Sequence, residues 1–167
     1  TGVQTCALPI WQPNAPATLK SSSQYNIFTF PYKSFHNLFQ FVVSAFYMAE
    51  KHHYGYNLKQ QYYIQSWLNI YNKDQFIDWH GHHYDTNWAW HGFFCVDTEP
   101  SNTIYKFDDN VEIIVPSLNN QLCIGICENN KHKTEAWTFD KPRITIAFDI
   151  VSVQALKNVQ YNHCIPI

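Results

Sequence analysis

The sequence contains little charge, and the charge that it has is balanced. Charged residues make up 14% of the chain, and 11 Lys and Arg residues against 13 Asp and Glu residues give a formal net charge of −2. A broad basic surface for nucleic acid or for an anionic membrane is therefore not indicated. Because aromatic residues make up 17% of the chain, the composition also excludes intrinsic disorder, which combines low hydrophobicity with high charge.

Long hydrophobic runs are absent as well. The richest stretch, residues 35–48, is interrupted by His36, Asn37, Gln40 and Ser44, whereas a membrane helix needs about 20 consecutive apolar residues. We therefore expect no membrane-spanning helix. With 167 residues, the chain is long enough for one domain with a real core and short for two.

Cysteine is infrequent and irregularly spaced. The five cysteines lie at positions 6, 95, 123, 127 and 164. Their odd number, without a visible secretory signal, indicates free thiols in a reducing compartment, so we expect a cytoplasmic protein. Cys123 and Cys127 lack the Cys-x-x-Cys spacing of common zinc sites, and we interpret them as small core residues.

The first ten residues, TGVQTCALPI, match the translation of a widely used sequencing-library adapter. We therefore expect residues 1–10 to be an artefact in a sequence from environmental DNA, with Cys6 foreign to the protein and the true N-terminus missing. Residues 11–167 are predicted to form a single domain.

Two kinds of hydrophobic periodicity divide this domain. Apolar residues recur at helical spacing over residues 35–51, which predicts an N-terminal amphipathic helix with Ser34 as its N-cap. Over about residues 61–151, short segments rich in aromatic and β-branched residues alternate with turn residues, which predicts a mainly β core built as a sandwich or barrel. The candidate strands are residues 61–71, 76–80, 88–97, 102–107, 111–116, 121–127 and 143–151.

The densest chemical signal is the segment DWHGHHYD at residues 78–85. Side chains at positions i and i+2 of an extended segment point the same way, so His80 and His82 can bind one metal ion. His83 and Asp85 have the same relation and form the alternative pair. The third ligand must come from elsewhere, and His132, after candidate strand 121–127, is the natural candidate. Two adjacent ligands and one distant ligand leave half of an octahedron open.

Further aromatic side chains and a histidine follow this cluster. Trp90, His91 and Phe93 lie on candidate strand 88–97. We expect these three side chains to line the pocket beside the metal, because such pockets are mostly apolar and aromatic. A position in the core is the alternative for His91.

The only arginine, Arg143, begins the alternating segment RITIAFDIV at residues 143–151. Period-2 alternation places Arg143, Thr145, Ala147 and Asp149 on one face of this strand. Because the other ten basic residues are all Lys, Arg143 is expected to do what ammonium cannot, which is to bind a carboxylate through two parallel hydrogen bonds. Thr145 can add a hydrogen bond to the same carboxylate. A structural salt bridge is the alternative.

Together these residues resemble the iron(II)- and 2-oxoglutarate-dependent oxygenase superfamily. The family pattern is a His-x-Asp or His-x-His pair, a distant His, and an Arg-x-Ser or Arg-x-Thr motif, which here correspond to His80, His82, His132 and residues 143–145. The chain is similar in particular to the small oxygenases of tailed phages and marine microbes, in the segments WLN (67–69), DWHGH (78–82), HGFFCV (91–96), EPS (99–101) and PRITIAFDI (142–150).

This resemblance implies a double-stranded β-helix of the jelly-roll or cupin-like kind. It also implies a dioxygenase that hydroxylates a substrate while 2-oxoglutarate is converted to succinate and CO₂. The cofactor Fe(II) would be held by His80, His82 and His132, and the far carboxylate of 2-oxoglutarate would meet Arg143, Thr145 and Tyr105. Most of the superfamily has a carboxylate as the second ligand, so His82 in that place gives a more cationic centre.

Two alternatives follow from the same residues. One is a cupin-like three-His metal dioxygenase that does not use 2-oxoglutarate, and the other is an inactive phage structural or assembly module. The sequence leaves the substrate open among a protein side chain, a nucleobase and a small molecule, and it leaves the oligomeric state open. The expected location is the cytoplasm of a bacterium or of a phage-infected host.

Overall fold

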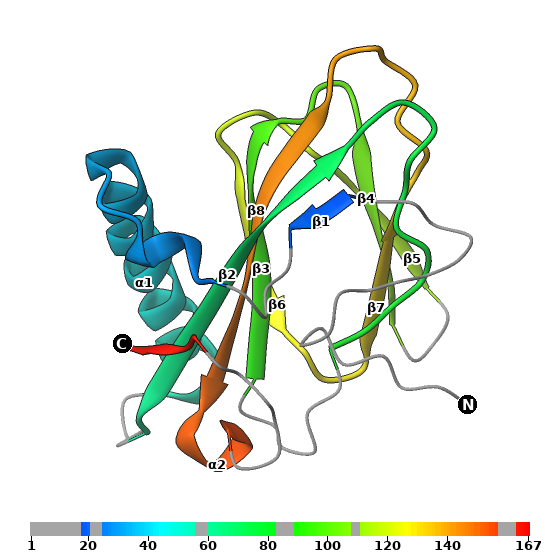
Figure 1. The fold of residues 1–167 in the computed structure, drawn as a ribbon. Helices are drawn as coiled ribbons and strands as arrows, with labels where there is room; N and C mark the ends of the chain where they lie inside the picture. Colours follow the sequence, from blue (N-terminus) through cyan, green and yellow to red (C-terminus); the bar gives the residue numbers. More distant parts are fainter. Residues whose placement is uncertain (1–17, 21–24, 56–59, 83–88, 108–110, 157–162) are drawn as a thin grey trace.

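The computed structural model describes residues 18–20, 25–55, 60–82, 89–107, 111–156 and 163–167 (Figure 1). The segment interpreted as an adapter, residues 1–10, lies outside the described residues. The alternative ligand pair of His83 and Asp85 lies outside them too.

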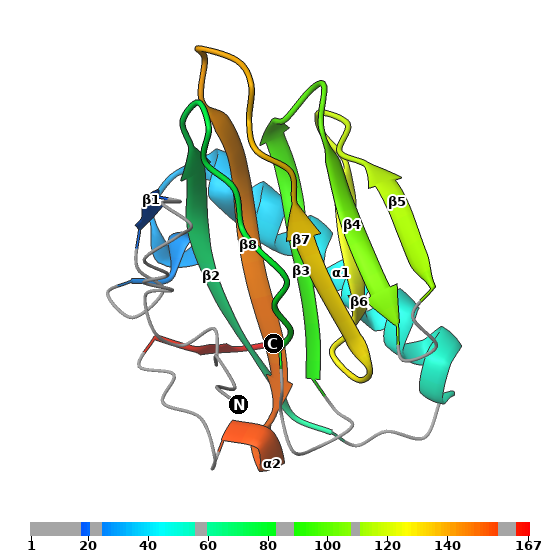
Figure 2. The same ribbon diagram turned by 90° about the vertical axis from the view of Figure 1, so that its right-hand side faces the viewer.

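Two antiparallel β-sheets face each other and form the core (Figures 1 and 2). The larger sheet has the strand order β1 (Thr18–Lys20), β2 (Tyr62–Tyr71), β8 (Arg143–Ser152), β3 (Ala89–Asp97) and β6 (Leu122–Ile126), and β9 (Ile165–Pro166) also pairs with β2. The smaller sheet has the order β5 (Glu112–Pro116), β4 (Asn102–Phe107) and β7 (Asn130–Thr134). The predicted mainly β fold, a double-stranded β-helix, is confirmed.

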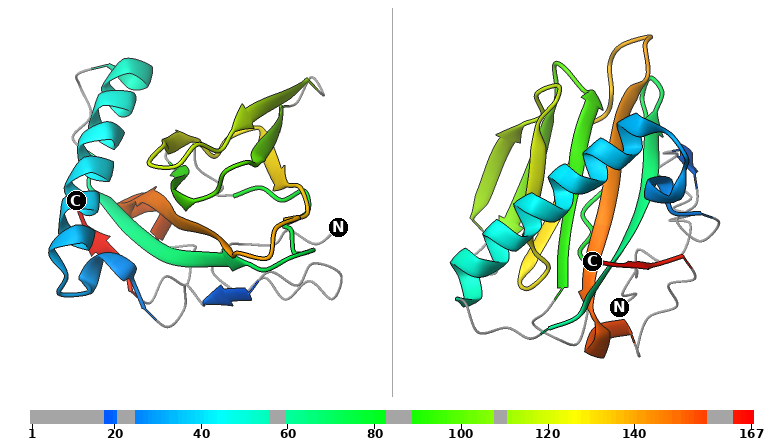
Figure 3. Two further views of the ribbon diagram at one scale, coloured as in Figure 1. Left: turned by 90° about the horizontal axis from the view of Figure 1, so that it is seen from above. Right: turned by 90° about the vertical axis from the view of Figure 1, so that its left-hand side faces the viewer.

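One long helix covers the outer face of the larger sheet, as Figure 3 shows. Helix α1 spans Lys33–Tyr54 and follows the short 3₁₀ helix η1 (Ile27–Thr29). It contains the whole predicted helix 35–51, but Ser34 lies in its first turn, and the N-cap is Tyr32 without a side-chain capping hydrogen bond. Val42 and Phe46 of α1 are buried against the sheet, where Phe148 belongs to the same hydrophobic cluster.

Trp90 belongs to this outer core and not to the pocket between the sheets. Its ring centroid lies 5.7 Å from that of Phe46 on α1. Neighbouring residues of a strand face opposite sides of the sheet. Because His91 and Phe93 point into the space between the sheets, Trp90 points to the outer face, toward α1. The expectation that Trp90 lines the pocket was therefore wrong.

The strand predictions failed at two places that matter for function. Residues 76–80 form no regular strand and contribute only an isolated antiparallel bridge between His80 and His132. Strand β7, which carries His132, was not predicted at all. Its sequence, NKHKT, has no hydrophobic alternation, and its conformation comes from pairing with β4 and with the segment around His80.

Strand β8 occupies the middle of the larger sheet, between β2 and β3. Ile146, Phe148 and Ile150 pack into the core beneath α1, as the alternation predicted. Arg143 and Thr145 line the cavity between the two sheets. Helix α2 (Val153–Leu156) follows β8. No helix among the described residues is long and apolar enough to cross a membrane.

Candidate metal centre

Three histidines from two separate stretches of chain meet between the sheets. Each of His80, His82 and His132 offers a ring nitrogen, and these nitrogen atoms all lie within 4.8 Å of one another. The three residues line the cavity between the sheets, and His82 and His132 are buried. The structure thus brings together the three residues that the sequence nominated as ligands.

Backbone pairing sets the distance between the two stretches. The amide of His80 donates to the carbonyl of His132 at 3.1 Å, and the amide of His132 donates to the carbonyl of His80 at 2.8 Å. Nearby, the amide of Thr134 donates to the carbonyl of Ile77 at 2.9 Å. These bonds tie the edge of the smaller sheet to residues 77–80, so the positions of the two rings are fixed by the fold and not by loop conformation alone.

The electrostatics of the cluster favour neutral imidazoles. Burial, together with the charge that His82 would carry, lowers the pKa of His80 from 6.5 to about 4. Burial and the neighbouring His80, His91 and His82 also lower the pKa of His132 well below its ordinary value. Neutral imidazole is the form that binds metal ions, so no proton competes for these nitrogens near neutral pH.

Two ring nitrogens also have the right hydrogen-bonding state for a metal ligand. Nδ1 of His80 donates to the carbonyl of Asp78 at 2.9 Å, which leaves Nε2 of that ring available. Nδ1 of His132 is buried and makes no hydrogen bond within the described part of the chain. A buried donor or acceptor without a partner is costly, and a metal ion would satisfy it. The residues present therefore fit a metal such as Fe(II).

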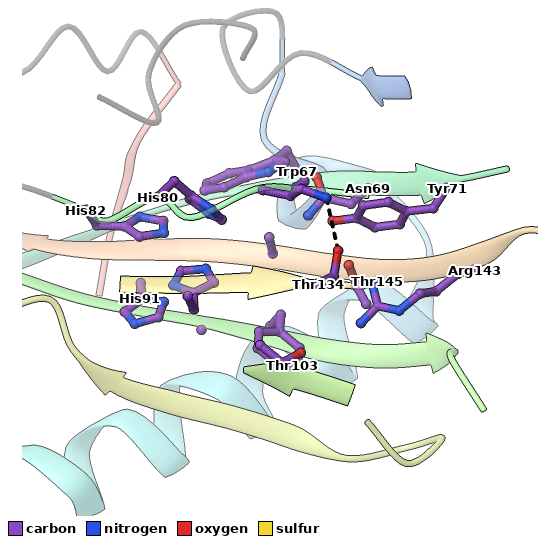
Figure 4. A pocket seen from close by; sticks show the side chains of 15 residues that line it. Trp67, Asn69, Tyr71, His80, His82, His91, Thr103, Thr134, Arg143 and Thr145 are labelled. Carbon is purple, nitrogen blue, oxygen red and sulfur yellow. Dashed lines mark hydrogen bonds between the residues drawn. The ribbon is translucent and has the colours of Figure 1, made fainter. Parts of the chain in front are cut away.

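A fourth histidine completes the cluster. The ring of His91, on β3, stacks on that of His82 at a centroid distance of 4.6 Å and on that of His132 at 4.7 Å. His91 and Phe93 both line the cavity, as the sequence predicted, and Trp67 and Ala147 add apolar surface. Figure 4 shows His80, His82 and His91 together at one end of this cavity.

Arg143 lies at the other end of the same cavity (Figure 4). Its side chain is only 2% exposed. Nε donates to Oγ of Ser101 at 3.0 Å, Nη2 donates to Oγ of Ser117 at 3.4 Å, and the guanidinium carbon lies 5.0 Å from the ring centroid of Tyr71. All of these partners are neutral. Within the described ranges of the chain, no carboxylate lies within 4.0 Å of the guanidinium.

The structure places a different tyrosine beside Arg143 from the one that the sequence suggested. Tyr71 pairs with Arg143 across β2 and β8, lines the cavity and is buried, which raises its pKa to about 12 although Arg143 lowers it. Tyr105 instead pairs with His132 across β4 and β7, with the two ring centroids 5.4 Å apart. Tyr105 therefore lies at the histidine end of the space between the sheets, and Tyr71 is the tyrosine beside Arg143.

Asn69 is a second cavity residue that sequence analysis missed. It pairs with Thr145 across β2 and β8, is buried, and lines the cavity. Its Oδ1 makes no hydrogen bond within the described part of the chain. The WLN segment already contained this residue, and the alternation of β2 would have placed Asn69 and Tyr71 on one face.

Comparison with known proteins gives a likeness in fold. No protein-family model matches the chain, and no curated protein sequence matches it. Among solved structures, a prolyl-4-hydroxylase from Pseudomonas putida superposes with a TM-score of 0.56 at 10% identity, covering 72% of this chain and 67% of that one. The chain has the fold of this hydroxylase.

Two other solved structures agree. An oxidoreductase of the 2OG-Fe(II) oxygenase family from Burkholderia pseudomallei has a TM-score of 0.53 at 11% identity, covering 71% of this chain and 57% of that one. A prolyl hydroxylase from Trichoplax adhaerens, solved with a peptide fragment of the hypoxia inducible factor oxygen degradation domain, has a TM-score of 0.54 at 8% identity, covering 75% and 60%. The chain thus spans about six tenths of the length of these two proteins.

Proposed function

We propose that this protein is an Fe(II)- and 2-oxoglutarate-dependent dioxygenase that hydroxylates its substrate. His80, His82 and His132 are the proposed metal ligands, and Arg143 is the proposed anchor for the far carboxylate of 2-oxoglutarate. The shared fold is consistent with this activity, and the residues of the cavity support it further.

The observation that carries the proposal is the environment of Arg143. A guanidinium that is only 2% exposed has lost most of its hydration, and its described partners are neutral. A buried charge without a counter-charge is unfavourable by several kcal/mol, roughly, so an anion is expected to bind there. Because the cavity that holds Arg143 also holds three clustered histidines, the fitting anion is a dicarboxylate that reaches from the guanidinium to a metal ion.

The side chains along the cavity have separate tasks in this proposal. Arg143 binds the far carboxylate, and Tyr71 and Thr145 stand beside it as hydrogen-bond donors. Trp67 and Phe93 form apolar walls that exclude water between the two ends. The bound iron would supply the oxidation chemistry, in which 2-oxoglutarate and O₂ yield succinate and CO₂ while a substrate C–H bond becomes C–OH.

The test combines iron binding with product analysis. The protein is reconstituted with Fe(II) under anaerobic conditions, and succinate is then measured after addition of 2-oxoglutarate and air. We expect one iron per chain and succinate release in the wild type, and loss of both in His132→Ala. His163→Ala is the matched control, because His163 is exposed and is not part of the cluster.

The same measurements separate the alternatives. In one outcome the wild type binds iron and releases no succinate, and substitution of Arg143 leaves 2-oxoglutarate binding unchanged. These two results together would favour a three-His dioxygenase that uses no 2-oxoglutarate. A protein that binds no iron under these conditions would be the inactive structural module.

A further inference from the structure

A buried carboxylate stands directly behind the histidine cluster. Asp149 lies on the central strand β8 and is 0% exposed. Its Oδ1 lies 2.8 Å from Nδ1 of His82, which is itself only 5% exposed. The other two ion pairs among the described residues, Lys73 with Asp140 and Lys141 with Asp97, lie at the surface. The pair of His82 and Asp149 is therefore the buried one.

The fold holds Asp149 firmly in this place. It lies opposite Gln65 of β2 on one side and opposite His91 of β3 on the other, so the strands on both sides hold this part of β8 in place. It lies on the same face of β8 as Arg143 and Thr145, and it is thus directed toward the space between the sheets. Its carboxylate contacts Nδ1 of His82, so the other ring nitrogen, Nε2, remains for a metal ion.

We propose that Asp149 is the charge-balancing carboxylate of the three-histidine centre, and that it acts through His82 as a positioning residue. This inference rests on the metal centre of the proposed function. A carboxylate at Nδ1 keeps the proton on that nitrogen, leaves Nε2 to bind the metal, and makes the imidazole a stronger electron donor.

The charge of the centre supports this assignment. A divalent ion with two neutral histidines and one carboxylate ligand has a total charge of +1, which is the usual His-x-Asp arrangement. A divalent ion with three neutral histidines has a charge of +2, and the carboxylate of Asp149 brings the sum back to +1. His82 can therefore take the place of a carboxylate ligand without making the buried centre more cationic. The negative charge is then carried by Asp149, which contacts the ligand His82 and does not contact the metal.

The experiment measures metal binding and not activity. Co(II) is titrated into the wild type, into Asp149→Asn and into Ser152→Ala, and the Co(II) absorption spectrum is recorded at saturation. Asn keeps an oxygen that accepts from His82 and removes only the charge. Ser152 is buried on the same strand but on its opposite face, so it controls for a polar substitution within β8. Thermal unfolding of the metal-free variants checks that each one folds.

We expect Asp149→Asn to weaken Co(II) binding by about 10- to 100-fold and to shift the absorption bands, with Ser152→Ala unchanged. Equal affinity and an equal spectrum in Asp149→Asn would overturn the inference and leave the proposed function intact. If the wild type binds no Co(II), the proposed metal centre itself fails.

A measurement on the wild type covers the case in which Asp149→Asn does not fold. With Zn(II) bound, ¹⁵N NMR of the histidine rings should show that Nδ1 of His82 is protonated and that Nε2 is the metal-bound nitrogen. Metal bound to Nδ1 of His82 would contradict the inference, because that nitrogen would then be unavailable to Asp149.

Discussion

Replacing Arg143 with methionine separates a ligand-binding arginine from a structural one. Methionine is flexible, apolar and similar in length, so it can fill the same space. Arg143 is 2% exposed and has hydrogen bonds only to Ser101 and Ser117, at 3.0 and 3.4 Å. An arginine that the fold needed would be expected to have a carboxylate partner, and the described residues provide none within 4.0 Å.

The effect on stability can be estimated from these contacts. Replacing buried charges with apolar residues is often neutral or stabilising, by about 1–4 kcal/mol. The two serine hydroxyls lose a partner, at a cost of roughly 1 kcal/mol each. The two contributions nearly cancel, so we expect the stability of the metal-free Arg143→Met variant to stay within about 2 kcal/mol of the wild type, which corresponds to a change in Tm of at most ~8 °C for a domain of this size.

The effect on 2-oxoglutarate binding should be larger, and it should be a loss. Two charge-assisted hydrogen bonds to a carboxylate contribute about 1.5–3 kcal/mol each, so the variant should bind 2-oxoglutarate roughly 10²- to 10⁴-fold more weakly. Calorimetry under anaerobic conditions, with the metal site filled by Mn(II), measures this affinity, and thermal unfolding measures the stability.

A control variant is available two residues away. Lys141→Met removes a positive charge near the start of the same strand, but Lys141 is exposed and pairs with Asp97 at the surface. It should change stability by ~1 kcal/mol or less and leave the affinity for 2-oxoglutarate unchanged. An Arg143→Met protein that loses several kcal/mol of stability and still binds 2-oxoglutarate like the wild type would show that Arg143 has a structural role instead.

Three further predictions concern stability. Gly92→Ala should destabilise the fold by about 1–3 kcal/mol in chemical unfolding, because the added Cβ would lie 2.4 Å from both the carbonyl oxygen of Cys123 and the ring of Phe148; wild-type stability would contradict this packing. Co(II) at 100 times its Kd should stabilise the protein by ~2.7 kcal/mol, reversibly with chelator, and this gain should vanish in His132→Ala. In the folded protein the pKa of His80 is about 4, below its ordinary value of 6.5. Between these two pH values the unfolded state binds more protons than the folded state, so the metal-free protein should lose stability as the pH falls from 6.5 to about 4. We expect His80→Gln to lose less stability over this pH range, and an equal loss in the variant and the wild type would refute this cause.

The sequence by itself determined which side chains share one face of a strand or helix. Alternation along residues 143–151 placed Arg143 and Thr145 together on one side, and the structure has both lining the cavity. The spacing of His80 and His82 placed two imidazoles on one side of an extended segment, and helical periodicity located the helix over residues 35–51. These features depend on the local geometry of a strand or helix, which has a fixed period, so they are visible without knowledge of the neighbours.

Only the tertiary structure decided which strands pair and which side chains from different strands come into contact. Strand β7 exists because β4 and the segment around His80 pair with it, and its own polar sequence gave no signal. The contact of Asp149 with His82, and the place of Tyr71 rather than Tyr105 beside Arg143, depend on strand order and register. Pairing across a sheet joins residues that lie far apart in the chain, and the periodicity of one strand contains no information about the residue that will lie opposite.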